Sequence, residues 1–179
     1  SREAPAPACR PPAAALRELP AALDRVFGDL TFAKPVQLLP YPGEAGAWLV
    51  VQHSGVVETV RDGAKRVYFD ISDRVDVGSQ WGLQEIALHP RFPADPRIFV
   101  AYVGPNHRSM VSSLRASVDG ATVDVGSEEI LLSEAQPAPW HPIASIEFGP
   151  DGCLYVAWGE GGGKSQDPAL LGGKMLRID

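Results

Sequence analysis

The sequence has few of the features that mark a metal centre, a nucleic-acid surface or a membrane span. It holds only two cysteines, with no CxxC pair and no Cys/His cluster, so a zinc site is not expected. The net charge is −6 and the basic residues are scattered, which argues against nucleic acid as a partner. No apolar run approaches the roughly 18 residues of a membrane span. These absences leave a globular protein, with hydrophobic residues at 45% and charged residues at 21%.

The two cysteines, Cys9 and Cys153, allow two interpretations. They are either unpaired thiols, with Cys153 buried in a strand, or a long-range disulfide of an exported protein. The sequence also begins at Ser1 rather than methionine, which favours the loss of an N-terminal segment and therefore export. The predicted localisation is periplasmic or secreted.

Glycine and proline are plentiful, with 18 and 17 residues, and they punctuate the chain throughout. Between them lie short apolar runs, and turn signals such as Asp62-Gly63 and Asp119-Gly120 indicate hairpins. Strands are predicted at 35–39, 47–51, 56–60, 65–71, 84–88, 97–102, 110–116, 128–132, 144–148, 153–158 and 174–178. Almost nothing indicates a long helix, so the prediction is an all-β sandwich, barrel or propeller.

The pattern near the C-terminus favours the propeller. In residues 146–156 (IEFGPDGCLYV) one strand ends in a Pro-Asp-Gly turn and the next begins with an apolar residue and tyrosine. Such hairpins are typical of propeller blades, which need four antiparallel strands and roughly 40–50 residues each. The prediction is therefore an extended or poorly ordered lead-in at 1–22, followed at 23–179 by about three to four blades.

Three segments together resemble one family. They are residues 80–92 (QWGLQEIALHPRF) with 95–102 (DPRIFVAY), residues 141–156 (HPIASIEFGPDGCLYV) leading into 159–162 (GEGG), and residues 170–179 (LLGGKMLRID). Their order and spacing are similar to the glucose/sorbosone dehydrogenase family, which includes the soluble aldose sugar dehydrogenases. The similarity extends over nearly all of residues 24–179, whereas each motif alone is weak.

The resemblance implies a six-bladed β-propeller that holds pyrroloquinoline quinone (PQQ) and calcium in a cleft on its top face. By position, His141 matches the histidine that acts as general base on the anomeric hydroxyl of a sugar while hydride moves to the quinone. Gln80 matches a polar residue beside the cofactor, and Trp140 is a candidate to stack on the flat quinone. No metal ligand is assigned, and the electron acceptor is unknown. The arginines that hold the cofactor lie further along the family's chain than residue 179.

Structural interpretations compete with each of these roles. His141 is otherwise a surface histidine in a proline-rich loop, and Gln80 is otherwise a loop cap. Trp140, like Trp81, is otherwise a residue that seals the space between blades. Glu160, in its glycine-rich run, is either a cation ligand or part of a tight turn.

The sequence also departs from the family after the histidine. The family usually has a polar residue and two glycines there, and this chain has Pro142, Ile143 and Ala144. Side chains at these positions are expected to crowd a cofactor. Two functions therefore stay open: part of a quinoprotein sugar dehydrogenase, or a non-catalytic propeller for protein or carbohydrate binding, as in hedgehog-binding relatives. The strand count is too low for a six-bladed ring, so these residues alone are expected to associate or be poorly stable. They are also expected to be inactive, because the arginines that hold the cofactor lie further along the family's chain.

Overall fold

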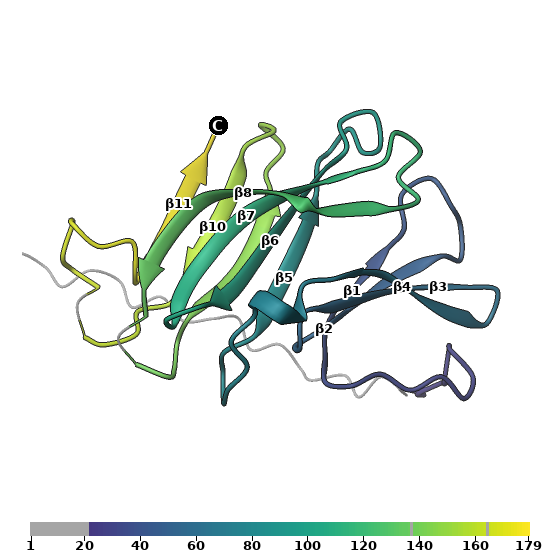
Figure 1. Cartoon of the computed structure of the whole chain (residues 1–179), viewed down its shortest axis with the longest axis horizontal. Coiled ribbons are helices and arrows are strands. Elements are labelled where there is room, and N and C mark those ends of the chain that lie inside the picture. The colour runs from purple at the N-terminus through teal and green to yellow at the C-terminus, as the bar shows by residue number, and fades with distance from the viewer. Residues whose placement is uncertain (1–21, 137, 164) are drawn as a thin grey trace, which may run out of the picture.

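The computed structural model describes residues 22–136, 138–163 and 165–179, and within them the fold is all-β. Three antiparallel sheets follow one another along the chain (Figure 1). Most of the predicted lead-in, residues 1–21, lies outside the described residues. The only helical element among the described residues is the three-residue 3-10 helix η1 (Ser72–Arg74), which connects the first and second sheets.

Each sheet is built from strands that are neighbours in the sequence. The first sheet has the order β1 (Pro35–Pro40), β2 (Trp48–Gln52), β3 (Val56–Arg61) and β4 (Ala64–Asp70). The second has the order β5 (Leu83–Leu88), β6 (Arg97–Gly104), β7 (Arg108–Ala116) and β8 (Val123–Ala135). The third has β9 (Ile143–Phe148), β10 (Leu154–Trp158) and β11 (Lys174–Ile178). The prediction of three to four blades is met at its lower end, by two four-stranded sheets and one three-stranded sheet.

The sheets stack face to face, and their first strands are neighbours. β1 contacts β5, and β5 contacts β9, while the last strands β4 and β8 also meet. This is the radial arrangement of propeller blades, in which the first strand of each blade faces the central axis. The predicted fold class, a partial β-propeller with antiparallel four-stranded blades, is confirmed.

Two hydrophobic clusters lie between the sheets, and β6 contributes to both. Ile98, Val100 and Tyr102 pack with the first sheet, whereas Phe99 and Ala101 pack with the third. Successive side chains of a strand point to opposite faces, so an uninterrupted apolar run is needed where both faces are covered. The run that was predicted as a strand at 97–102 is therefore the centre of the molecule.

The two-residue turn between β3 and β4 follows from its sequence. Asp62 and Gly63 have φ values of 49° and 72°. A hairpin turn with positive φ at both central residues suits Asp-Gly, because glycine has no Cβ to clash and aspartate tolerates the left-handed region.

Candidate functional site

The loop that carries His141 lies between β8 and β9, and its main chain is held from two sides. The His141 N–H donates to Oε1 of Gln80 at 2.7 Å. Nε2 of Gln136 donates to the carbonyl oxygens of Trp140 at 2.9 Å and of His141 at 3.3 Å. His141 has a φ of 52°, in the left-handed region that residues other than glycine adopt uncommonly. The structure thus brings two predicted site residues, His141 and Gln80, into direct contact.

Two buried polar residues, Ser109 and Gln136, form hydrogen bonds that support this loop. Ser109, in β7, is fully buried, and Gln136 is 7% exposed. The Ser109 hydroxyl donates to Oε1 of Gln136 at 3.1 Å and accepts the N–H of Ile143 at 3.2 Å. The second sheet is therefore hydrogen-bonded to both ends of the His141 loop.

Gln80 lies in the loop between η1 and β5, and its neighbours are ordered by local contacts. Its carbonyl oxygen accepts Nε2 of Gln84 at 2.7 Å. The adjacent Trp81 stacks on His107, with ring centroids 4.1 Å apart, and Nδ1 of His107 lies 3.1 Å from Oδ2 of Asp76. Gln80 also accepts the His141 N–H, so it joins the two loops rather than only capping its own.

The glycine-rich run after β10 packs against the His141 loop. A Cβ at Gly159 would overlap the carbonyl oxygens of His141 and Pro142, and one at Gly161 would overlap the side-chain amide of Gln136. Glycine is required at these two positions because any side chain would collide with the neighbouring loop. The sequence motif is therefore explained by packing beside the candidate base.

These loops border a cleft of about 550 Å³. It is lined by His53, Gln80, Gln84, His141, Pro142, Ile143, Ala144, Gly159 and Glu160. A smaller cavity of about 280 Å³ shares Gly159 and Glu160 with it and extends toward Glu134 and Trp158. Within the described residues no lysine or arginine lines the larger cleft. Its polar groups are amides, imidazoles and one carboxylate, which suit hydrogen bonding to a neutral polyhydroxylated ligand.

His53 is a cleft residue that the sequence analysis did not identify. It follows β2, its side chain packs against Gly82, and its Nδ1 is buried with no hydrogen-bond partner among the described residues. Burial, and secondarily the charge of Lys34, lower the pKa of His53. The imidazole is therefore neutral near pH 7. The only signal for His53 in the sequence is its position in a loop directly after a buried strand, which is where the other site residues also lie.

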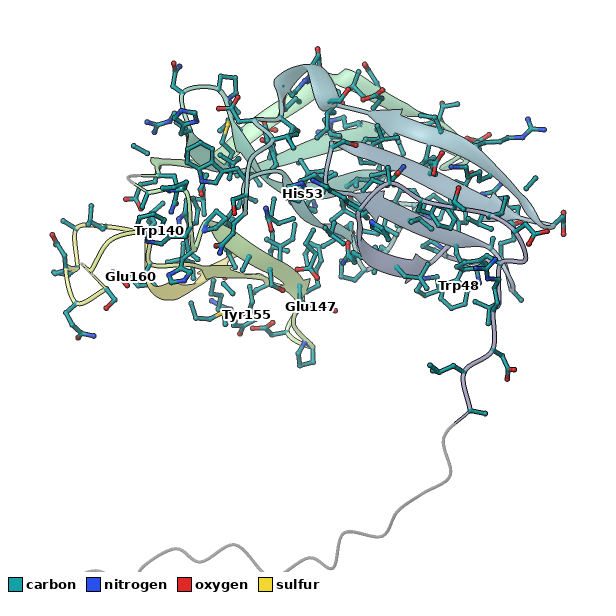
Figure 2. All side chains as sticks on the ribbon, turned by 90° about the horizontal axis from the view of Figure 1, so that it is seen from below. Trp48, His53, Trp140, Glu147, Tyr155 and Glu160 are labelled. Carbon is teal, nitrogen blue, oxygen red and sulfur yellow. The ribbon has the colours of Figure 1, made fainter. Side chains whose placement is uncertain are left out.

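Trp140 is exposed and does not seal the space between blades. Its exposed fraction is 50%, and it lies near Glu160 in the loops of the third sheet, whereas Glu147 and Tyr155 project from the outer face of that sheet (Figure 2). Its predicted stacking on a cofactor stays a prediction. The tryptophan that does pack between the second and third sheets is Trp158.

The three residues after His141, which stand where the family has a polar residue and two glycines, differ in exposure. Ile143 is fully buried in the cluster between the second and third sheets, and Pro142 is also buried. Ala144 is exposed and adds only a methyl group to the cleft wall. All three residues still line the cleft, so the expected crowding of a cofactor stays a prediction.

The described part of the chain contains no group of three or more His, Cys, Asp or Glu side chains that is placed to hold a metal. Glu160 has one buried carboxylate oxygen without a hydrogen-bond partner. Glu134, the other carboxylate that borders the smaller cavity, already accepts the N–H groups of Leu171 and Gly172.

No helix in the described ranges is long and apolar enough to cross a membrane. Cys153 is buried, and Cys9 lies outside the described residues.

Comparisons with known proteins converge on one group. A family profile described as Glucose / Sorbosone dehydrogenase matches residues 32–179. An oxidoreductase from Thermus thermophilus, described as a glucose dehydrogenase, superposes with a TM-score of 0.70 at 32% identity, covering 82% of this chain and 43% of that one. The PQQ-bound aldose sugar dehydrogenase of Streptomyces coelicolor superposes with a TM-score of 0.71 at 26% identity, covering 82% of this chain and 45% of that one.

Curated relatives match a smaller share of this chain. The Hedgehog-interacting protein of Mus musculus is 29% identical over 112 residues, which cover 54% of this chain and 16% of the mouse protein. The HIPL2 protein of Arabidopsis thaliana is 26% identical over 157 residues, covering 63% of this chain and 23% of the plant protein. The chain thus spans less than half the length of the solved relatives and under a quarter of these curated ones.

Proposed function

The chain belongs to the glucose/sorbosone dehydrogenase family, and on that premise we propose that it forms part of a quinoprotein that oxidises an aldose at the anomeric carbon. The observation that carries the proposal is the hydrogen bond between the His141 N–H and Gln80, two residues that line a cleft whose polar groups are amides, imidazoles and one carboxylate. The solved relative from Streptomyces coelicolor is a PQQ-bound enzyme, which supports the same cofactor here.

The residues of the cleft fit the reacting edge of such a site. The amides of Gln80 and Gln84 and the imidazole of His53 supply hydrogen-bond donors and acceptors for sugar hydroxyls or a quinone carbonyl. The carboxylates of PQQ need cationic partners, which do not line this cleft within the described residues. No calcium ligand is assigned within those residues either. We therefore assign to this part of the chain the sugar side of the site rather than the carboxylate side.

His141 is proposed to hold the proton in the reaction. Its imidazole takes the proton of the anomeric hydroxyl, for which an imidazole suits conditions near neutral pH. The bound quinone supplies the hydride acceptor that this oxidation requires. Trp140 is proposed to present its exposed ring to the flat cofactor. Export to the periplasm or medium is part of the same proposal.

The test uses the whole quinoprotein of which this chain is proposed to form part, because residues 1–179 alone are expected to be inactive. Loaded with PQQ and calcium, it is compared with its His141→Ala variant in a dye-linked glucose assay. Loss of a general base is expected to lower turnover by about 10²–10⁴-fold. Quinone binding, followed by titration, is expected to change little, because the charges that hold the cofactor lie elsewhere. Glu147→Ala, an exposed substitution on the outer face of β9, serves as control. Full turnover in His141→Ala would refute the assignment of the base.

A second function is favoured by one specific observation. The mouse and human Hedgehog-interacting proteins match this chain at 29% and 28% identity over 112 residues. Pro142, Ile143 and Ala144 also stand where the resemblance leads us to expect a polar residue and glycines. A propeller used only for binding would neither take up PQQ nor reduce the dye with glucose, so the same titration distinguishes the two functions.

A further inference from the structure

The main chain at His141 adopts a conformation that is uncommon for a residue other than glycine. Its φ of 52° is in the left-handed region, which is unfavourable for a side chain with a Cβ. Such conformations persist where surrounding contacts determine them, and they cluster at functional sites. Side-chain hydrogen bonds determine this one, because the His141 N–H bonds to Gln80 from another loop, and the carbonyls of Trp140 and His141 bond to Gln136 at the start of the same loop.

We propose that Gln136 and Ser109 are positioning residues, which hold the backbone of His141 in its left-handed conformation and so direct its imidazole into the cleft. The inference rests on the proposed function, because a direction matters only if the imidazole acts on a ligand. Gln136 and Ser109 themselves touch no reacting atom.

The burial of the pair makes the support specific. Ser109 is fully buried, and Gln136 is 7% exposed and also lines the cavity of about 280 Å³. Each group uses both hydrogen-bonding capacities: Gln136 donates to the loop and accepts from Ser109, and Ser109 donates to Gln136 and accepts from Ile143. Removing either partner leaves a buried polar group unsatisfied, which is the costly case. The loop is expected to shift to regain those bonds.

Gly161 shows that the position of Gln136 is also restricted from the other side. A side chain at Gly161 would overlap the Gln136 amide, and Gly161 itself has a φ of 59°. The amide is thus enclosed by the glycine-rich loop, by β7 through Ser109, and by the His141 loop. A base must come within about 3 Å of the proton that it removes, so a displacement of the loop by about 1 Å is expected to lower the turnover rate.

The experiment uses Ser109→Ala and Gln136→Met, with Ser112→Ala as the matched control. Ser112 is also fully buried in β7, but its hydroxyl makes no hydrogen bond to the loop. In two-dimensional NMR spectra, the amide signals of His141 and Ile143 are expected to shift in the first two variants and not in the control. Exchange of the Ile143 amide with solvent is expected to accelerate about 2- to 10-fold, the range for one lost hydrogen bond.

Turnover separates positioning from general stability. In the whole quinoprotein loaded with PQQ and calcium, Ser109→Ala and Gln136→Met are expected to lower kcat by on the order of 10- to 10²-fold with little change in KM. Ser112→Ala is expected to leave kcat unchanged. Unchanged His141 and Ile143 signals in Ser109→Ala would overturn the positioning role. If the signals shift while His141→Ala keeps full turnover, the proposed function fails and the structural support stands. If Gln136→Met does not fold, the comparison of Ser109→Ala with Ser112→Ala still tests the positioning role.

Discussion

The carboxylate of Glu85 connects all three sheets, and its removal is expected to destabilise the protein strongly. Glu85 lies in β5, and its Oε1 accepts Nε2 of Gln37 from β1 at 3.0 Å. Its Oε2 accepts the main-chain N–H of Ile146 in β9 at 2.6 Å. Gln37 in turn bonds to the N–H and the carbonyl of Ile86. One side chain therefore fastens the first strands of three sheets to each other.

The expected loss follows from these two bonds. A hydrogen bond to a charged group contributes about 1.5–3 kcal/mol, and an orphaned N–H adds to the loss when it is shielded from water. Glu85 is only half-buried, which reduces the sum, so Glu85→Ala is expected to lower the free energy of unfolding by about 2–3 kcal/mol. For a chain of this size that corresponds to a fall in Tm of about 4–12 °C. Glu85→Gln keeps one acceptor oxygen and is expected to lose about 1 kcal/mol.

Urea unfolding, followed by circular dichroism and extrapolated to zero denaturant, measures this change. The slope with denaturant is expected to stay the same, because the surface exposed on unfolding does not change. Glu147→Ala is the control, since Glu147 is exposed on the neighbouring strand β9. Its removal is expected to change the free energy of unfolding by less than about 0.5 kcal/mol. Equal stability of Glu85→Ala and Glu147→Ala would refute the view that the carboxylate holds the sheets together.

Two further perturbations test contacts near the ends of strands. Arg97 donates to both oxygens of Asp95, at 2.9 and 2.8 Å, and these bonds lower the pKa of Asp95 from 3.8 to about 2. A lowered pKa stabilises the fold above about pH 4, and this contribution is lost as the pH falls toward 2. Asp95→Asn should therefore flatten the acid-induced loss of stability between these pH values. An unchanged dependence of stability on pH would contradict the role of the Asp95–Arg97 pair. Gly159→Ala would place a methyl group against the carbonyls of His141 and Pro142, so we expect a loss of about 1–3 kcal/mol in thermal unfolding and shifted His141 signals, whereas unchanged signals would show that the two loops do not touch.

Much of the fold was predictable because its signals are local. Apolar runs between turn residues placed the strands, and Asp62-Gly63 identified a two-residue hairpin whose positive φ values the structure confirms. The largest difference is β8, which was predicted at 128–132 and runs over Val123–Ala135. Half of the eight additional residues are polar, and they become strand because they pair with the long strand β7. Local propensity carries no information about such a partner.

The candidate site was only partly predictable. His141 and Gln80 were selected through the family resemblance, and they are 61 positions apart in the sequence, so that only the folded chain brings them into contact. The burial of the His53 Nδ1 and the pairing of Ser109 with Gln136 depend on how whole sheets pack. No periodicity of the sequence encodes these contacts.

The sequence by itself determined the all-β class, the order of the strands and the family, because alternation, turn chemistry and motif spacing are properties of neighbouring residues. Tertiary structure alone decided which polar groups meet. Glu85 touches β1 and β9, and Gln136 touches β7 and the His141 loop, because stacking the sheets brings distant backbone groups within hydrogen-bonding range. Buried polar groups must find partners, and the partners that they find are those that the packing of the sheets leaves within reach.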